Sequence, residues 1–159
     1  MVKDDTNYNN SYGTTNGSTS LPLNFYLSLQ CERRTILKEI FLCIYKIAGD
    51  EAAMLRVALG EAIINALRYG ISIRIKINVI GNKLVIRVKD DGPGFDGNSL
   101  IEKYLAEGKE KIFNSGIYEE HGRGIKIMLL WTNLVTYNKQ GNEVLLVKEI
   151  ATNRNPLQC

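Results

Sequence analysis

The sequence predicts an α/β protein, a two-layer α/β sandwich in which a mixed, mostly antiparallel sheet carries helices on one face. Three observations lead to this prediction. Apolar and polar residues alternate along an early segment, two runs with helical periodicity follow it, and two β-hairpin patterns come later in the chain. Hairpins join antiparallel strands, and helices packed on one side of a sheet bury the apolar faces of both layers.

The first strand and two helices open the predicted domain. From residue 21 to 29, apolar residues alternate with polar ones, which is the period of a half-buried strand. Residues 32–48 then place apolar side chains at helical spacing. A second helix is expected to begin at Asp50, which can cap it, and to run to about Tyr69.

Two hairpins supply the remaining strands. Residues 72–80 and 83–89 are β-branched runs separated by Gly81-Asn82, a strong two-residue turn signal. Strands 134–138 and 143–150 surround a Gln-Gly-Asn turn in the same way.

The segment between the hairpins has a weaker pattern. Within residues 96–121, the apolar positions of 100–105 indicate a short helix, but glycines and charged residues interrupt the rest. We therefore expect a mobile loop there, followed by a helix from about Ile125 to Trp131.

The length and composition indicate one globular domain. Of the 159 residues, 45% are hydrophobic and 23% are charged, which is enough for one core. The net charge is +3 without long runs of one sign, so we expect no direct nucleic-acid binding and no membrane binding. Cys31, Cys43 and Cys159 form no C-x-x-C pair, and no apolar run is long enough to span a bilayer. These features predict a reduced, cytoplasmic protein.

The domain is expected to span residues 21–150. Residues 1–20 are rich in small polar residues and cannot bury enough apolar surface to offset chain entropy, so they are predicted to be a disordered tail or a linker. Residues 151–159 are predicted to be a C-terminal tail. A native tail and a linker within a longer protein would have the same composition.

Glu61 and Asn65 form the first candidate motif. They lie four residues apart on the second helix and therefore share one face. Asn65 offers a neutral oxygen ligand of the kind that Mg²⁺ accepts. Glu61 could then orient or deprotonate a hydroxyl or water beside a terminal phosphate. The alternative is a solvated pair on an exposed helix face.

Asp90, Gly92 and Gly94 form the second motif, at the end of a strand. The carboxylate of Asp90 could accept a hydrogen bond from the exocyclic amine of adenine, and the glycines could let the backbone approach a flat base. The alternative is an ordinary acidic Gly-Pro turn. Phe95, which follows, is expected to anchor the core.

Gly122, Arg123 and Gly124 form the third motif, immediately before a helix. The free amides and the positive end of the helix dipole could face a phosphate chain, and Arg123 could add charge to the terminal group. The alternative is a flexible helix entry with a solvated arginine. Tyr69 and His121 are expected to have structural duties.

Taken together, the motifs resemble the N, G1 and G2 boxes of the ATP-binding fold shared by gyrases, heat-shock chaperones, histidine kinases and MutL-type proteins, the GHKL or Bergerat fold. The resemblance covers about residues 21–150. Within that superfamily the chain is most similar to the small serine/threonine kinases that act as anti-sigma factors, including the run Gly-Arg-Gly-Ile-Lys-Ile-Met at 122–128.

The resemblance implies ATP and Mg²⁺ as ligands and transfer of the γ-phosphate to a serine or threonine. Matching by position, Glu61 is the catalytic base, Asn65 the magnesium ligand and Asp90 the adenine-binding acid. The nucleotide-contacting loops are matched by Gly92, Gly94, Gly122, Arg123 and Gly124.

The resemblance also implies partners. The phosphate acceptor would be an antagonist protein of the STAS type, and a sigma factor or similar regulator would be the sequestered partner. A homodimer is expected through the first strand and its neighbouring helix, with Tyr26, Leu27 and Leu29 as candidates. Two alternatives remain: a nucleotide-dependent protein-binding switch without phosphotransfer, and a fragment of a larger multidomain regulator.

Overall fold

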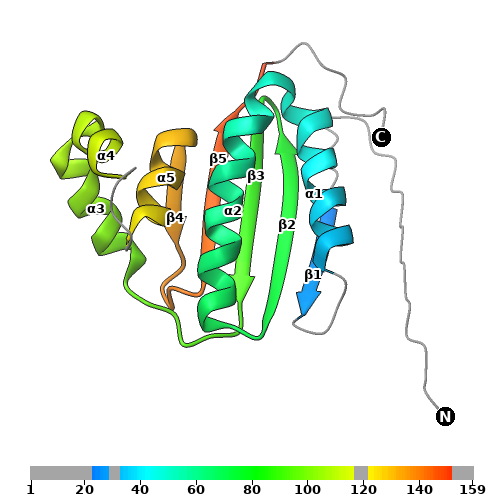
Figure 1. The fold of residues 1–159 in the computed structure, drawn as a ribbon, viewed down its shortest axis with the longest axis horizontal. Coiled ribbons are helices and arrows are strands. Elements are labelled where there is room, and N and C mark those ends of the chain that lie inside the picture. The colour runs from blue at the N-terminus through cyan, green and yellow to red at the C-terminus, as the bar shows by residue number, and fades with distance from the viewer. Residues whose placement is uncertain (1–22, 29–32, 117–121, 152–159) are drawn as a thin grey trace.

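The protein folds as a sheet covered by helices on one face. The computed structural model describes residues 23–28, 33–116 and 122–151. The five-stranded sheet has the order β1-β2-β3-β5-β4, and α1, α2 and α5 lie across one face of it (Figure 1). Helices α3 and α4 lie beyond the β4 edge (Figure 1). The predicted two-layer α/β sandwich is therefore confirmed, whereas the predicted tail at 1–20 lies outside the described residues.

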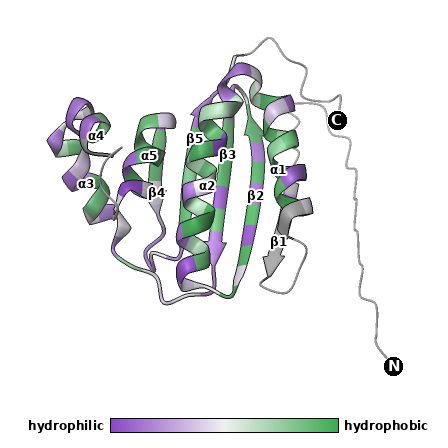
Figure 2. Cartoon of the chain, viewed as in Figure 1, coloured by the Kyte–Doolittle hydropathy of each residue, from purple (hydrophilic) through white to green (hydrophobic). Residues whose placement is uncertain are grey.

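The strands agree closely with the hairpin patterns. Each of the four pairings between neighbouring strands is antiparallel, so the described sheet is antiparallel throughout and not mixed as predicted. In Figure 2, hydrophobic and hydrophilic residues alternate along β2, whose exposed and buried residues alternate over its first six positions. The strands are β1 (Leu23–Ser28), β2 (Ser72–Ile80), β3 (Lys83–Asp90), β4 (Leu134–Tyr137) and β5 (Glu143–Glu149).

The two helices after β1 are joined by a tight turn that the sequence did not reveal. Helix α1 (Arg33–Ala48) ends before Gly49, whose φ is +58°, and Gly49–Glu51 form a short 3₁₀ turn that continues into α2 (Ala52–Tyr69). Asp50 lies within this turn, so the prediction that it caps α2 is wrong. The 3₁₀ turn begins the second helix in place of a side-chain cap.

Two helices occupy the segment predicted to be a mobile loop. Helix α3 (Gly97–Glu107) begins where the Asp96 side chain accepts a hydrogen bond from the Ser99 amide, and α4 (Lys109–Gly116) follows a glycine with φ +86°. The short helix predicted at 100–105 is thus real but longer, and the loop prediction is wrong for the described part. His121 lies outside the described residues.

Contacts distant in sequence explain the stability of these helices. Ile101 and Ile112 are buried, and the ammonium group of Lys126, on α5 (Arg123–Trp131), lies 4.9 Å from the ring centroid of Tyr104 on α3. Lys126 is itself 4% exposed. A cation held over an aromatic ring stabilises the contact between α3 and α5.

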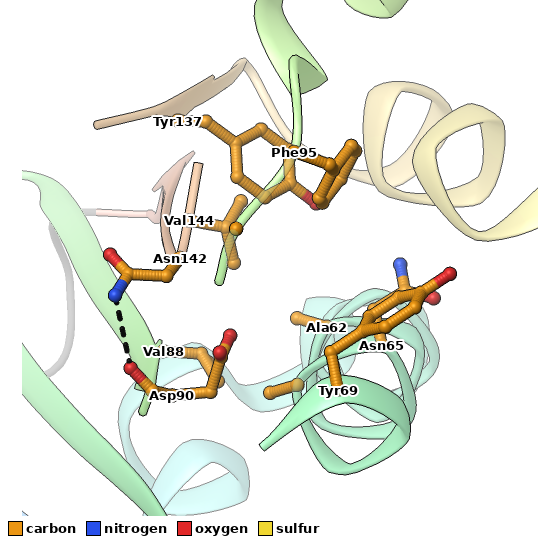
Figure 3. Close-up of a pocket in the computed structure, with 11 residues that line it drawn as sticks. Ala62, Asn65, Tyr69, Val88, Asp90, Phe95, Tyr137, Asn142 and Val144 are labelled. Carbon is orange, nitrogen blue, oxygen red and sulfur yellow. Dashed lines mark hydrogen bonds between the residues drawn. The ribbon is translucent and has the colours of Figure 1, made fainter. Parts of the chain in front are cut away.

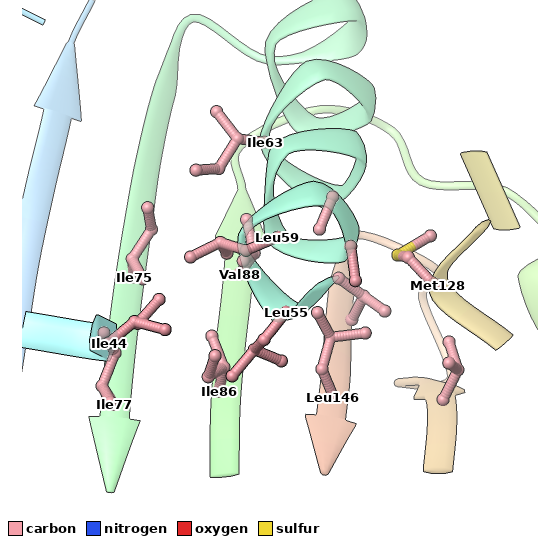
Figure 4. Packing of buried hydrophobic residues seen from close by; sticks show 14 of the residues in the cluster. Ile44, Leu55, Leu59, Ile63, Ile75, Ile77, Ile86, Val88, Met128 and Leu146 are labelled. Atoms are coloured by element: carbon pink, nitrogen blue, oxygen red, sulfur yellow. The ribbon is translucent and has the colours of Figure 1, made fainter. Parts of the chain in front are cut away.

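The core lies between α2 and the sheet, and it fixes the rotation of α2. Leu55, Leu59 and Ile63 project toward the sheet (Figure 4). Burying these side chains stabilises the fold by about 1.5–3 kcal/mol each. They meet side chains of β2, β3, β5 and α5, namely Ile75, Ile77, Ile86, Val88, Leu146 and Met128. Among the described helices, none combines the length and apolar character needed to cross a bilayer.

Candidate functional site

A cavity opens beside the C-terminal half of α2 (Figure 3). Its walls come from segments far apart in the chain: α2, the end of β3 with the following loop, and the β4–β5 hairpin. Two predicted motifs, those of Asn65 and Asp90, therefore meet here. The lining residues are Ala62, Asn65, Ala66, Tyr69, Val88, Asp90, Gly94, Phe95, Tyr137, Asn142 and Val144.

Asp90 is held at the cavity by its backbone. Its N–H donates to the Asn142 carbonyl at 2.9 Å, and the Asn142 side-chain amide donates to the Asp90 carbonyl at 3.3 Å. The Gly92 N–H donates to Asp90 Oδ1 at 2.7 Å. Figure 3 shows the carboxylate directed into the cavity. Asp90 can therefore accept a hydrogen bond from a ligand amine.

Burial raises the pKa of Asp90 above its ordinary value, and the neighbouring charge of Asp91 raises it further, whereas the Gly92 amide lowers it. Burial therefore disfavours the charged form of Asp90, whose carboxylate is incompletely solvated. A ligand donor that faces this carboxylate would supply part of the missing solvation.

Asp91, the second acid of the motif, has a structural role that the sequence did not predict. Its carboxylate accepts from the amides of Ser72 and Ile71 at 3.1 and 2.7 Å, and from the Ser72 hydroxyl at 2.9 Å. The hydrogen bonds of Ser72 and Ile71 lower the pKa of Asp91. Asp91 thus joins the start of β2 to the end of β3 and leaves Asp90 as the acid of the cavity.

The glycines of this motif serve close approaches within the protein. A Cβ atom at Gly92 would lie 2.6 Å from the carbonyl oxygen of Tyr69, the last residue of α2. Only glycine therefore fits at this position. Gly94 has φ +78° and lies against the backbone of Gln140 and Gly141. Gly94 lines the cavity, whereas Gly92 is not among its lining residues.

Glu61 and Asn65 face the first turn of α5. A Cβ atom at Gly124 would lie 3.0 Å from Asn65 Nδ2 and 3.1 Å from Glu61 Oε2, which shows how closely the two side chains approach this backbone. Both residues are half-buried. The pair therefore does not lie on a fully exposed helix face, and the first and third motifs meet at Gly124.

The start of α5 is suited to an anion. Its N-cap is Gly122, with φ +81°, and no side chain caps it among the described residues. The first amides of this helix and the positive end of its dipole are therefore available to a phosphate group. Arg123 is exposed at the same place. The site thus has an acid at one end and a helix N-terminus at the other.

Two aromatic rings line the cavity where the sequence predicted only structural duties. Phe95 is 36% exposed, and its ring meets that of Tyr137 edge to face at 4.9 Å, so it is not simply a core anchor. Tyr69 is 57% exposed, with its ring centroid 6.5 Å from that of Phe95. Both rings can contact a planar ligand. The signal for Tyr69 was its position four residues after Asn65, on the same helix face.

The donor set fits a magnesium ion that is shared with a ligand. Among the described residues, no group of three or more His, Cys, Asp or Glu side chains could enclose a metal. Mg²⁺ is commonly bound by one or two protein oxygens together with water and substrate phosphates. Asn65 supplies such an oxygen, and Glu61 lies beside it at Gly124.

Comparison with known proteins agrees with this geometry. The family model described as the histidine kinase-like ATPase domain matches residues 32–148. That range runs from the start of α1 almost to the end of β5 and includes all three motifs. No curated protein matches the sequence.

Proposed function

The chain belongs to the histidine kinase-like ATPase domain family, and from this premise we propose that it is a protein kinase of the anti-sigma factor type. It would transfer the γ-phosphate of ATP to a serine or threonine of a STAS-type antagonist protein. Membership of the family establishes the nucleotide-binding ATPase domain. The observation that best supports the kinase is the approach of Glu61 and Asn65 to Gly124, because in the proposed binding mode this brings a carboxylate beside the phosphates.

ATP would bind with its base beside Asp90 and its phosphates beside α5. The carboxylate of Asp90 would accept from the exocyclic amine of adenine, with Tyr69 and Phe95 against the ring. The first amides of α5 would hold phosphate oxygens, and Arg123 would add positive charge. When bound, Mg²⁺ would neutralise negative charge on the phosphates, with Asn65 as its protein ligand.

Glu61 would act as the general base. As the acceptor hydroxyl attacks the γ-phosphorus, a new O–P bond forms, the bond between that phosphorus and the β–γ bridging oxygen breaks, and ADP leaves. The hydroxyl proton passes to the Glu61 carboxylate. The half-buried position of Glu61 beside Gly124 would hold its carboxylate in place for this role.

We propose that the sequestered partner is a sigma factor or an equivalent regulator, and that the chain acts as a homodimer. In the described part of the sheet, β1 pairs only with β2, so one edge of this strand is available for a second copy. Tyr26 and Leu27 lie on β1, whereas Leu29 lies outside the described residues.

Native mass spectrometry with ATP and Mg²⁺ tests the nucleotide site, and it is expected to show one nucleotide per chain. Asp90→Asn is expected to lose nucleotide binding, since it removes the charge but keeps an oxygen for the Gly92 amide.

The same variant tests whether the loss comes from unfolding. The raised pKa of Asp90 means that the folded state binds the proton more tightly than the unfolded state. Ionised Asp90 therefore destabilises the free protein at neutral pH, and this variant should melt no lower than the wild type while losing nucleotide.

With radiolabelled ATP and purified STAS-domain proteins, the wild-type chain is expected to transfer the labelled phosphate to one hydroxyl of its partner protein. Tight binding of a partner without label transfer would instead support the protein-binding switch. Absence of nucleotide binding by the wild-type chain would contradict both functions.

Gly124→Ala is expected to slow phosphate transfer about a hundredfold, because the added methyl group displaces Glu61 and Asn65 by a few tenths of an ångström or more. Single-turnover transfer measures this rate. The free energy of unfolding should not fall, since alanine favours a helix over glycine by about 1 kcal/mol.

Gly60→Ala is the matched control, because it adds a methyl group to a helical glycine with no atom within 4 Å. It should raise the free energy of unfolding by about 1 kcal/mol and leave the transfer rate unchanged. Equal rates in both variants would contradict the role assigned to the contact at Gly124.

A further inference from the structure

The Tyr137 hydroxyl is buried in the cavity without a partner. Tyr137 is the last residue of β4, is 8% exposed and lines the cavity (Figure 3). Its hydroxyl oxygen is inaccessible and forms no hydrogen bond with any described residue. A buried polar group without a partner costs about 1–3 kcal/mol. Phenylalanine would fill the same space without that cost, so packing alone does not explain a tyrosine here.

All other parts of Tyr137 are fixed. Its backbone N–H donates to Asn98 Oδ1 at 2.8 Å, and its carbonyl accepts from Asn98 Nδ2 at 2.9 Å. The ring meets Phe95 edge to face, and it lies so close to Gly97 that a Cβ atom there would overlap it. The hydroxyl is therefore held in one position, as expected for a group that recognises a ligand.

The surroundings of the hydroxyl place it between the two ends of the site. Burial raises the pKa of Tyr137 to about 12, the charge of Asp90 also raises it, and the nearby Asn65 amide lowers it. Asn65 lies near enough to the hydroxyl to affect its pKa, but no hydrogen bond joins the two side chains. At neutral pH the phenol keeps its proton and can donate it. Tyr137 therefore lines the same cavity as Asp90, the proposed base-binding acid, and Asn65, the predicted magnesium ligand.

We infer that Tyr137 is a nucleotide-recognition residue, whose hydroxyl donates a hydrogen bond to an acceptor atom of the ligand between its base and its phosphate chain. The inference rests on the proposed function in one respect, which is that a nucleotide enters this cavity. The acceptor belongs either to the nucleoside or to a phosphate, and both offer oxygen or nitrogen atoms to a phenol.

Isothermal titration of Tyr137→Phe with adenosine and with ADP tests the inference. Affinity is expected to fall about tenfold, the equivalent of one hydrogen bond. Weaker binding of both ligands places the acceptor on the nucleoside, and weaker binding of ADP alone places it on a phosphate. Without ligand, the melting temperature should stay equal or rise, because the lost hydroxyl has no protein partner.

Tyr45→Phe is the matched control, since it removes a hydroxyl from a tyrosine that is 65% exposed on α1, outside the cavity. It should leave both affinities unchanged. If the wild type binds adenosine and ADP and Tyr137→Phe binds them with the same affinities, this inference alone would be overturned. A wild-type chain that binds neither ligand would overturn the proposed function together with the inference. A lower melting temperature of ligand-free Tyr137→Phe would assign the hydroxyl a structural role and also overturn it.

Discussion

Glu61→Gln is expected to lower the rate of phosphate transfer about a thousandfold, within the range that general-base catalysis supplies. Glutamine has the size of glutamate and keeps an oxygen at the end of the side chain near Gly124, but it cannot take a proton from the acceptor hydroxyl. The affinity for ATP should change less than about threefold, because the base-binding residues are untouched. Single-turnover transfer of radiolabel and calorimetric titration measure the two quantities separately.

Glu149→Gln is the matched control. It makes the same chemical change at an exposed position of β5. Glu149 pairs with Lys83, which begins β3, whereas Asp90 ends that strand. An unchanged transfer rate in Glu61→Gln would contradict the assignment of Glu61 as the general base. An equal loss of transfer and ATP affinity would instead assign Glu61 to ligand binding.

Gly94→Ala is expected to lower the free energy of unfolding by more than about 3 kcal/mol, or to prevent folding. Two effects add at this position. The residue has φ +78°, which disfavours an L side chain by about 1–2 kcal/mol, and the new Cβ atom would overlap the Gln140 carbonyl. The obstacle is backbone of the β4–β5 turn, so it cannot be relieved by a rotamer change. Urea unfolding measures the effect.

Gly81→Ala separates the two effects. Gly81 has φ +59° in the β2–β3 turn, but no atom lies within 4 Å of its Cβ position. Only the conformational cost of about 1–2 kcal/mol should remain. If Gly94→Ala and Gly81→Ala lower the free energy of unfolding equally, the steric clash assigned to Gly94 and the Gln140 backbone would be contradicted.

The sequence predicted most of the elements because their signals are local. The period of β2 and the Gly81-Asn82 turn need only a few neighbouring residues, and both agree with the structure. Glu61 and Asn65 could be placed on one face from their spacing, and Asp90 from the end of its strand. These local facts were sufficient to propose a site, although the sequence could not show that Gly124 meets the first two.

The errors concern contacts between segments distant in the chain. The short helix predicted at 100–105 was too short, and α4 was taken for part of a loop, because contacts such as that of Lys126 on α5 with Tyr104 on α3 leave no local pattern. The position of Tyr137 in the cavity was missed because a tyrosine that ends a strand gives no local sign of facing a cavity. Asp91 could not be distinguished from Asp90, because its partners are at the start of β2. Periodicity does not report such long-range pairings.

Two hydrogen bonds between Asn98 on α3 and the backbone of Tyr137 link this helix to the wall of the cavity. Asn98 lies in the first turn of α3, so this helix cannot swing away while both bonds persist. A protein that displaced α3 would thereby shift the phenol, and a nucleotide that fixed the phenol would resist the displacement. Occupancy of the cavity and the position of α3 are therefore expected to be coupled through the contacts between Asn98 and Tyr137.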